Sequence, residues 1–442
     1  MASDWKLSTL EEAGVVLIDC VHKTPPATDQ GYPYIGIPQI KNGCIDFSLN
    51  PRLISYSDYK KWTIKADPKA DDIVLSRRCN PGETAYVPQG VEFALGQNLV
   101  LLRSVGYKIY PPFLRWLVRG PEWWAQVGKY LNVGAVFDSL RCGEIPRFEL
   151  LIPPLSEQKA IAHILGSLDD KIELNRQMNE TLEAMAQALF KSWFVDFDPV
   201  IDNALAAGKP IPDEFIERAE QRKAIEKKDN SDIQNLFPDE FEFTEEMGWI
   251  PKGWGFGMLA DICFFGKGKI NTSELSLENY VSTENMNKEK AGISYAASIA
   301  STSQVPKFSV GQTLISNIRP YFKKIWLASF SGGRSNDVLG FQANNAVANE
   351  YLFSLLYQDS FFDYMTATSK GTKMPRGDKA AIMSWSVAIP PLILMEEFSN
   401  KVKPMYLANN IHSKQAISLS ELRDTLLPKL MSGELRIPDD IV

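Results

Sequence analysis

The sequence predicts an α+β protein with an internal pseudo-two-fold repeat, in which two globular domains are separated by two long antiparallel helices that form a coiled coil. Three observations support this prediction. The tetrapeptide Ile-Pro-Pro-Leu occurs at residues 152–155 and again at 389–392. A stretch of short β-like and helical runs precedes each copy. A stretch with heptad periodicity follows each copy.

The composition is that of a folded protein with several domains. A chain of 442 residues is too long for one ordinary core. Its hydrophobic content is 45% and its charged content 23%, and no apolar run approaches the roughly 18 residues needed to span a membrane. The five cysteines are odd in number and lack metal-site spacing. We therefore expect a cytoplasmic protein with reduced thiols, no metal site and no membrane segment.

The negative charge of the chain is concentrated in one segment. The net charge is −7, and residues 198–247 alone hold 14 acidic and 6 basic residues. Residues 1–153 hold 17 basic and 16 acidic residues, and residues 248–391 hold 14 basic and 10 acidic residues. The overall acidity therefore does not exclude binding to a polyanion.

Landmarks recur in the same order in the two halves. At the shift of 237 residues that relates the two tetrapeptides, Gly134 matches Gly371 and Phe148 matches Trp385. Upstream, residues 72–76 match residues 312–316 at a shift of 240. Chance could produce one such match but hardly the ordered series. Within each half, β-like runs at 72–76, 99–102, 313–316 and 325–329 and helical patterns at 113–118 and 351–357 predict a compact α+β domain.

The heptad segments predict the two long helices. The first seam comprises Ile161, Leu165, Leu168, Ile172, Asn175, Asn179, Leu182, Ala186 and Leu189. The second comprises Phe398, Val402, Met405, Asn409, His412, Ala416, Leu419, Arg423 and Leu426. Pro404 is expected to disturb the first turns of the second helix.

Two arrangements of these helices are open. Each helix could pack on its own domain, or the two could pair with each other. Polar residues at matching depth, Asn175 and Asn179 against Asn409 and His412, favour pairing because buried polar groups fix register. The residues assigned to pairing or partner docking are Ile161, Leu165, Leu168, Ile172, Leu182, Leu189, Trp193, Phe398, Val402, Leu419 and Leu426. Trp193 and Phe194 are expected on a face left free for a partner.

Several strings resemble one known family. Residues 152–162 (IPPLSEQKAIA), 168–176 (LDDKIELNR) and 179–197 (NETLEAMAQALFKSWFVDF) are similar to the central conserved region of type I restriction–modification specificity subunits. Residues 426–435 (LLPKLMSGEL) resemble their distal conserved region. Residues 22–25 (HKTP) and 248–254 (GWIPKGW) resemble the entry motifs of their two target-recognition domains. At 392–396 this chain has LILME, where the family usually repeats a Glu-Gln pair.

The resemblance implies a subunit without catalytic activity that reads a split, asymmetric DNA target. It implies double-stranded DNA, two adenine-methyltransferase subunits and restriction subunits as partners, with S-adenosylmethionine, ATP and Mg²⁺ held by those partners rather than by this chain. The implied division is a first recognition domain at 1–153, a central helical region at 154–197, an acidic linker at 198–247, a second recognition domain at 248–390, a distal helical region at 391–435 and a tail at 436–442. A helix of about 36 residues is roughly 54 Å long, which suits half-sites about one DNA turn or more apart.

Basic residues in loops are the candidates for contact with DNA. They follow equivalent β-like runs or lie in glycine-rich loops, where they could hold phosphates or bond to guanine edges. The set is Lys23, Arg77, Arg78, Arg141, Lys267, Lys269, Arg319, Lys323, Lys324, Lys373 and Arg376. For any one of them, ordinary surface charge is an equal alternative. Their matched positions in the two halves favour DNA.

No complete catalytic motif is present in the sequence. Residues 110–113 (YPPF) imitate a methyltransferase loop, but Tyr110 replaces the residue that would accept the proton of the amino group. Residues 264–268 (FFGKG) imitate a loop that binds the methyl donor, but they lie in the other half. The alternative from another functional class is a scaffold whose helices bind protein alone.

Overall fold

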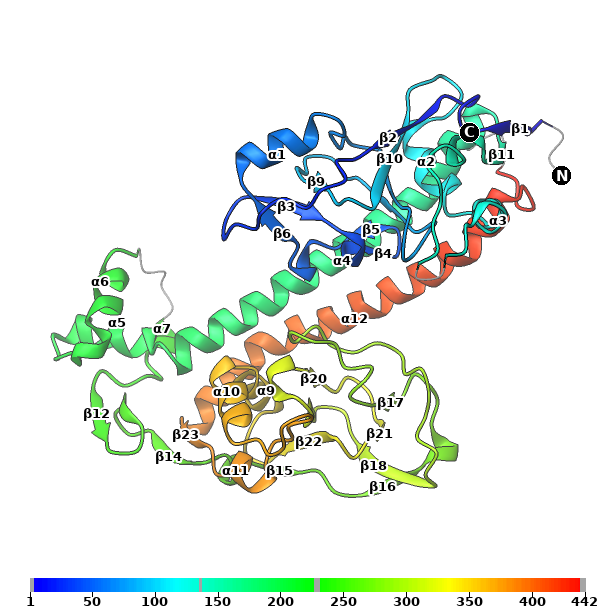
Figure 1. The fold of residues 1–442 in the computed structure, drawn as a ribbon. Helices are drawn as coiled ribbons and strands as arrows, with labels where there is room; N and C mark the ends of the chain where they lie inside the picture. The colour runs from blue at the N-terminus through cyan, green and yellow to red at the C-terminus, as the bar shows by residue number, and fades with distance from the viewer. Residues whose placement is uncertain (1–3, 135–136, 226–230, 438–442) are drawn as a thin grey trace. The chain divides into compact units, whose positions relative to one another are not determined.

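The computed structural model describes residues 4–134, 137–225 and 231–437 (Figure 1). The chain divides into two compact units, which we call unit 1 (residues 1–175 and 415–442) and unit 2 (residues 176–414). The division falls within the two long helices, α4 (Leu155–Phe194) and α12 (Leu392–Met431), so each helix contributes to both units. Part of the predicted tail, residues 438–442, lies outside the described residues.

Unit 1 is built on an antiparallel sheet with the order β2-β10-β7-β8. Every side chain of β7 is buried, as expected for a central strand. Helix α1 begins after Ser55, whose side chain accepts a hydrogen bond from the Asp58 amide, and α3 begins with Pro121 at its first position. The strands are β1 (Lys6–Thr9), β2 (Val15–Asp19), β3 (Tyr32–Ile35), β4 (Ile40–Lys41), β5 (Cys44–Ile45), β6 (Arg52–Ile54), β7 (Ile73–Ser76), β8 (Thr84–Tyr86), β9 (Ala94–Leu95), β10 (Leu99–Ser104) and β11 (Glu149–Ile152), and the short helices are α1 (Tyr56–Thr63), α2 (Pro111–Leu117) and α3 (Pro121–Tyr130).

Unit 2 contains a sheet with the order β15-β22-β19-β20 and a second sheet with the order β16-β18-β21-β17. The Asp378 side chain caps α11 by accepting hydrogen bonds from the amides of Ala380 and Ala381. The strands are β12 (Phe241–Thr244), β13 (Gly248–Pro251), β14 (Gly255–Met258), β15 (Cys263–Phe265), β16 (Lys269–Asn271), β17 (Tyr280–Val281), β18 (Gln304–Phe308), β19 (Thr313–Ser316), β20 (Ile325–Leu327), β21 (Gly332–Arg334), β22 (Val338–Ala343) and β23 (Ser386–Ile389). The shorter helices are α5 (Asp198–Ala207), α6 (Ile216–Lys223), α7 (Ser231–Gln234), α8 (Leu259–Ile262), α9 (Asn349–Leu356), α10 (Asp359–Ala367) and α11 (Lys379–Met383).

The two units repeat one topology, which confirms the internal repeat. The strand order β2-β10-β7-β8 in unit 1 corresponds to β15-β22-β19-β20 in unit 2. In each unit a pair of helices follows the sheet, α2 and α3 or α9 and α10, and an antiparallel strand pair precedes the long helix, β1 with β11 or β14 with β23. Both long helices contain 40 residues. They begin at Leu155 and Leu392, the equivalent leucines of the repeated tetrapeptide.

Helices α4 and α12 pair in antiparallel orientation. Within unit 1, Arg423 Nη1 donates to Asp169 Oδ1 at 2.7 Å. Within unit 2, the Asn179 amide bonds to Ser413 Oγ at 3.0 Å, and Asn179 Oδ1 lies 3.2 Å from His412 Nδ1. As predicted, Asn179 of the first seam meets Asn409 and His412 of the second. The amide Nδ2 of Asn175, in contrast, is buried without a hydrogen-bond partner among the described residues.

Proline 404 does not disturb α12, contrary to the prediction. The helix is continuous from Leu392 to Met431. Proline in a helix interior costs about 3 kcal/mol. Leu394, Met395, Phe398 and Val402, in the three turns before Pro404, are all at most 1% exposed. Their burial is worth roughly 1.5–3 kcal/mol for each side chain, so tertiary packing outweighs the local penalty.

The acidic segment 198–247 is folded where the structure describes it, and the expectation of a linker is wrong. Val200 and Phe237 lie in the core of unit 2. The Arg218 guanidinium donates to both Asp198 oxygens at 2.7 Å, so the buried carboxylate is paired with an opposite charge. Among the described residues of the whole chain, no helix is both long and apolar enough to cross a membrane.

The aromatic cluster at the end of α4 gives a stability prediction. Phe190 is 1% exposed and packs against Phe398 and Tyr351, with ring centroids 5.6 and 5.7 Å apart. Phe190→Ala should therefore lower the free energy of unfolding by about 3–5 kcal/mol. Met185→Ala on the same helix is the control, because Met185 is 51% exposed, and it should change stability by less than about 0.5 kcal/mol. Denaturant unfolding of the full chain measures both; equal effects would contradict the assigned core.

Candidate nucleic-acid interface

The loops that follow β7 and β19 take the same turn. In unit 1 the Ser76 hydroxyl donates to the Arg78 carbonyl at 2.9 Å. In unit 2 the Ser316 hydroxyl donates to the Ile318 carbonyl at 3.2 Å. The next residue is left-handed in both loops, with φ of 65° at Cys79 and 50° at Arg319. The repeat therefore extends from the sheet into the loop backbone.

A second loop lies against the first in each unit. In unit 1 the Leu140 amide donates to the Arg77 carbonyl at 2.9 Å, and Arg78 forms a β-bridge with Ser139. In unit 2 the Gly377 amide donates to the Asn317 carbonyl at 3.2 Å, and a β-bridge joins Ile318 with Arg376. Each unit thus brings together two loops that the sequence had marked separately. Position 77 of unit 1 corresponds to position 317 of unit 2.

The unit 1 candidates differ in their exposure. Arg78 and Arg141 are exposed, and Arg141 lies 3.8 Å from Glu144. Arg77 is partly buried, and its Nε–H has no hydrogen-bond partner among the described residues. Lys23 has an exposed side chain, and its backbone carbonyl accepts from Trp62 Nε1 at 2.9 Å. Arg77 is therefore the unit 1 candidate whose side chain has a buried donor, Nε–H, without a hydrogen-bond partner among the described residues.

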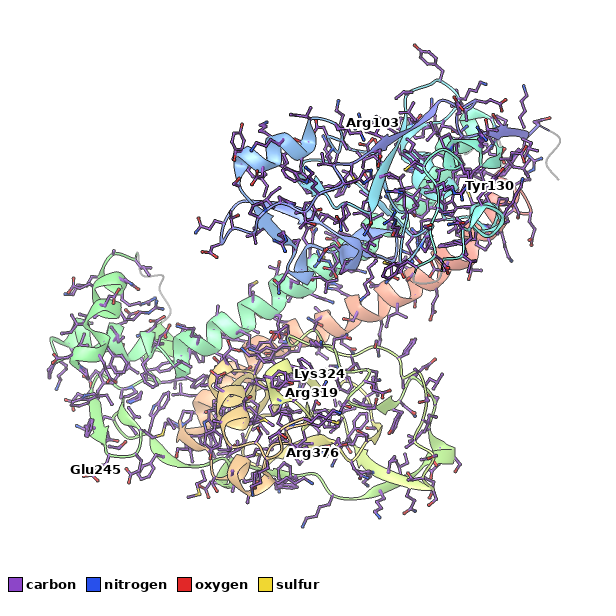
Figure 2. All side chains as sticks on the ribbon, viewed as in Figure 1. Arg103, Tyr130, Glu245, Arg319, Lys324 and Arg376 are labelled. Carbon is purple, nitrogen blue, oxygen red and sulfur yellow. The ribbon has the colours of Figure 1, made fainter. Side chains whose placement is uncertain are left out.

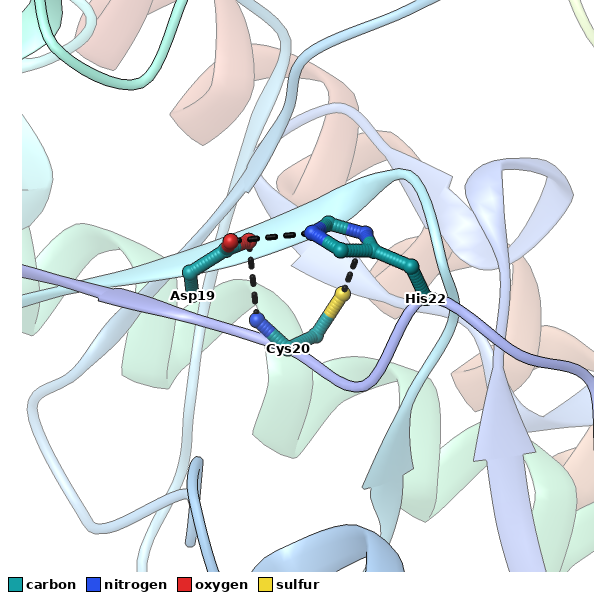
Figure 3. Close-up of side chains that lie close together, drawn as sticks. All are labelled: Asp19, Cys20 and His22. Atoms are coloured by element: carbon teal, nitrogen blue, oxygen red, sulfur yellow. Dashed lines mark hydrogen bonds and ion pairs between the residues drawn. The ribbon is translucent and has the colours of Figure 1, made fainter.

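Asp19, Cys20 and His22, beside Lys23, form a hydrogen-bonded cluster (Figure 3). His22 Nδ1 lies 3.0 Å from the Gln97 carbonyl oxygen, and His22 Nε2 lies 2.9 Å from Asp19 Oδ2. Both partners are oxygen acceptors, so each ring nitrogen of His22 faces one of them. The Asp19 and Cys20 ligand atoms face opposite ring nitrogens, and burial raises the pKa of the Cys20 thiol to about 11. The cluster is thus suited to fixing the 19–23 segment and poorly suited to binding one metal ion.

Three of the predicted unit 2 cations already have protein partners. Figure 2 labels two of them, Lys324 and Arg376, with Arg319. Arg376 donates to Asp337 through Nε at 3.0 Å and Nη2 at 3.3 Å. Lys324 Nζ donates to the Thr283 carbonyl at 2.6 Å, and burial lowers the pKa of Lys324.

Lys323 is the third paired cation. Its Nζ lies 2.9 Å from Asp359 Oδ1, which also accepts from Lys290 Nζ at 2.8 Å. Hydrogen bonds from Lys290 and Lys323 hold the pKa of Asp359 below its usual value. Sequence analysis could not find these contacts, because Asp359 lies 36 residues from Lys323 along the chain.

The remaining unit 2 candidates are Lys267, Lys269, Lys373 and Arg319. The three lysines are exposed and form no ion pair within the described part of the chain. Arg319 is partly buried, and its Nε–H lacks a partner among the described residues.

Sequence analysis missed Arg334, which is 7% exposed. Its guanidinium donates to the carbonyls of Val338 and Gly266, and burial lowers its pKa. Arg334 therefore fixes the start of the loop that carries Lys267 and leads into β16 at Lys269.

Comparisons with known proteins relate the chain to one family. Residues 3–184 match the model of the family described as type I restriction modification DNA specificity domain. The HindI specificity subunit of Haemophilus influenzae is 26% identical over 84% of this chain and 88% of its own. The MjaIX specificity subunit of Methanocaldococcus jannaschii is 24% identical over 99% of this chain and 94% of its own. The chain belongs to the family of type I specificity subunits.

A solved specificity subunit shares the fold. The crystal structure of the S subunit from M. genitalium aligns with a TM-score of 0.55 and 15% identity, covering 97% of this chain and 96% of that one. The fold of this specificity subunit, mixed sheets with two long paired helices, is thus that of the family.

The helix residues assigned to pairing or docking are all at least partly buried. Ile161, Leu165, Trp193, Phe398 and Val402 are buried, and Leu168, Ile172, Leu182, Leu189, Leu419 and Leu426 are of intermediate exposure. The expectation that Trp193 and Phe194 lie on a free face is wrong. They are 5% and 8% exposed, because Phe237, Trp254 and Phe398 pack around them.

The contacts of the lysines predict which of them contribute to DNA binding. Lys373→Ala should reduce the log–log salt slope of binding by about 0.9, the value for one lost phosphate contact. Lys323→Ala should change the slope much less, because Lys323 is engaged by Asp359 at 2.9 Å. Titration of the assembled complex with a target duplex at several salt concentrations measures both slopes. A larger change for Lys323→Ala than for Lys373→Ala would contradict the assignment.

Proposed function

We propose that this specificity subunit reads a bipartite, asymmetric DNA target, one half through each α+β domain. The observation that carries the proposal is the matched pair of loops. Each domain presents two loops at the end of its sheet, held together by equivalent backbone hydrogen bonds, Leu140 to Arg77 and Gly377 to Asn317. A scaffold that reads sequence needs such constant backbone geometry, since base contacts require side chains in fixed places.

Different side chains on the same backbone support an asymmetric target. Arginine 77 in the first domain is replaced by Asn317 at the equivalent position of the second. The unpartnered Nε–H groups of Arg77 and Arg319 support contact with an acceptor from outside the chain. Phosphate oxygens and guanine edges both supply such acceptors. The exposed Lys267, Lys269 and Lys373 are suited to phosphate contacts.

The long helices are suited to docking other subunits of the complex. One face of α4 in unit 2 carries a shallow hollow lined by Gln177, Glu180, Thr181, Ala184, Met185 and Ala188. Exposed apolar residues lie on both helices, including Leu174 and Met178 on α4 and Leu407 and Ile411 on α12. We assign this surface to adenine-methyltransferase subunits, with restriction subunits completing the complex. In this proposal the partners bind S-adenosylmethionine, ATP and Mg²⁺, and this chain contributes DNA specificity.

Domain replacement tests the assignment of half-sites. Replacing residues 248–389 with the equivalent domain of a relative should change one half of the methylated motif and leave the other unchanged. Genome-wide mapping of methylated adenines, in strains with the wild-type gene, the chimaeric gene and no gene, measures the motif. A change in both halves would contradict the assignment of one domain to one half-site. The absence of any gene-dependent motif, with no salt-dependent DNA binding, would favour a scaffold that binds protein alone.

Paired insertions test whether the helices set the spacing of the half-sites. Four residues added after Asn175 and four before Gln415 should lengthen both helices by about 6 Å and keep the polar contacts of Asn179. The gap in the methylated motif should grow by about one to two base pairs, at 3.4 Å for each base-pair step. Insertion in α4 alone is the control and should impair assembly. An unchanged gap in an active complex would show that the helices do not set the distance.

A further inference from the structure

The loop between β19 and β20 carries two adjacent aromatic side chains. It spans residues 317–324 and contains one turn of 3-10 helix, Pro320–Phe322. Tyr321 is 46% exposed. Its ring packs edge-to-face on the Phe322 ring, with centroids 4.8 Å apart. A large aromatic ring is therefore presented to solvent on a loop that the matched turns assign to DNA.

Two neighbouring segments hold the backbone of this turn. On one side the Arg319 amide donates to the Pro375 carbonyl at 2.8 Å. On the other side the Glu289 amide donates to the Phe322 carbonyl at 2.9 Å. Arg319 and Lys323, which flank the turn, are both left-handed, with φ of 50° and 49°. The turn is therefore fixed at both ends, as the support of a residue that reads sequence must be.

Two cations lie at the Phe322 ring. Lys288 Nζ lies 4.1 Å from the ring centroid, and the guanidinium carbon of Arg319 lies 5.9 Å from it. Contact with an aromatic ring attracts a cation to one place without neutralising its charge. Both cations are thus held at the ring that supports Tyr321.

Carboxylates near this turn act on other lysines. Asp359 lies 2.9 Å from Lys323 Nζ. Burial lowers the pKa of Lys324, the charge of Lys288 adds to this effect, and Glu284 opposes it. Lys288 itself is exposed and forms no ion pair within the described part of the chain. Its positive charge is therefore available to a phosphate group.

The equivalent loop of unit 1 has no aromatic residue. Both loops share the serine turn and the left-handed residue after it, Cys79 or Arg319. The next three residues are Asn-Pro-Gly at 80–82 in unit 1 and Pro-Tyr-Phe at 320–322 in unit 2. The common turn thus carries different side chains in the two units, as the reading of two different half-sites requires.

We propose that the Tyr321 ring contacts base pairs of the half-site read by unit 2, and that Lys288 binds a DNA phosphate beside it. The inference rests on the proposed function and assigns one base contact and one phosphate contact to it. An apolar side chain can contact the methyl group of thymine in the major groove. Tyrosine supplies such contact area at a low cost in conformational entropy. Neither residue was among the candidates that the sequence predicted.

The test uses the full chain in complex with its methyltransferase subunits. The complex is titrated with the target duplex and with duplexes that carry single base-pair changes. Tyr321→Ala should lower target affinity about tenfold and reduce discrimination by a similar factor at one or more positions of the unit 2 half-site. Discrimination in the other half-site should stay unchanged, which shows that the complex is folded. Tyr321→Phe keeps the ring and should retain discrimination in both half-sites.

Tyr107→Ala is the matched control for the loss of an exposed tyrosine. Tyr107 is 96% exposed and follows β10, at the opposite end of the unit 1 sheet from Arg77. This variant should leave affinity and discrimination unchanged.

Lys288→Ala should weaken binding to all duplexes alike and reduce the log–log salt slope by about 0.9. Lys69→Ala is its control, because Lys69 is exposed and precedes β7 at the end of the strand opposite to Arg77. It should leave the slope unchanged.

The outcomes separate the inference from the proposed function. Full discrimination by Tyr321→Ala, or equal losses in Tyr321→Ala and Tyr321→Phe, would show that the ring does not contact bases, while the proposed function stands. An unchanged salt slope for Lys288→Ala would overturn the phosphate contact. If the wild-type complex shows no preference among the duplexes, the proposed function fails together with the inference.

Discussion

The polar contacts between α4 and α12 fix the register of the two helices, and the rest of each unit depends on that register. Asn179 bonds to Ser413 and contacts His412, and Asp169 accepts from Arg423 and Arg115. An apolar seam alone would let one helix shift along the other, because after the shift one leucine side chain takes the place of another. A slide of one turn would leave these polar groups unpaired, at about 1–3 kcal/mol for each neutral group and more for the charged pair. Strand β11 leads directly into α4 and β23 into α12, so the same contacts constrain where each sheet begins.

The sequence was sufficient to predict the repeat and the paired helices, because both depend on local patterns. The Pro-Pro-Leu strings mark helix starts since proline stops a strand and is tolerated at the first turn of a helix. Tertiary effects were not predictable in this way. Pro404 stays helical because the turns before it are buried. Trp193 is buried because Phe237 and Phe398, from later segments of the chain, pack against it. A heptad pattern does not contain that information.

The position of the candidate site could be predicted from the sequence, but which basic residues are available to bind DNA could not. The equivalent spacing of landmarks in the two halves predicted the loops after β7 and β19. The equivalent hydrogen bonds from Ser76 and Ser316 in these loops agree with that prediction. Which cations are available depends on acids distant in sequence. Asp337 engages Arg376 from 39 residues away, and Asp359 engages Lys323 from 36. Folding brings these acids next to the basic residues, so the ion pairs can be recognised only in the structure. The basic residues thus fall into three groups: those that pair with protein groups, those that are exposed to solvent, and the partly buried Arg77 and Arg319, whose Nε–H groups lack a partner among the described residues.

A comparison of equivalent polar pairs shows how one backbone can carry two chemistries. Asp72 and Arg103 form a partly buried ion pair between β10 and the start of β7. The equivalent positions in unit 2 are Gln312 and Gln342, whose amides are hydrogen-bonded at 2.7 Å. Both pairs join the two strands at the same point of the sheet, so the scaffold survives the exchange, although Gln312 Oε1 is left without a partner among the described residues. The side chains of Arg77 and Asn317 can differ in the same way. In each unit it is the backbone carbonyl of this residue, and not its side chain, that holds the second loop. Constant backbone hydrogen bonds with interchangeable side chains are the physical condition under which two halves of one chain can diverge in specificity and keep a common fold.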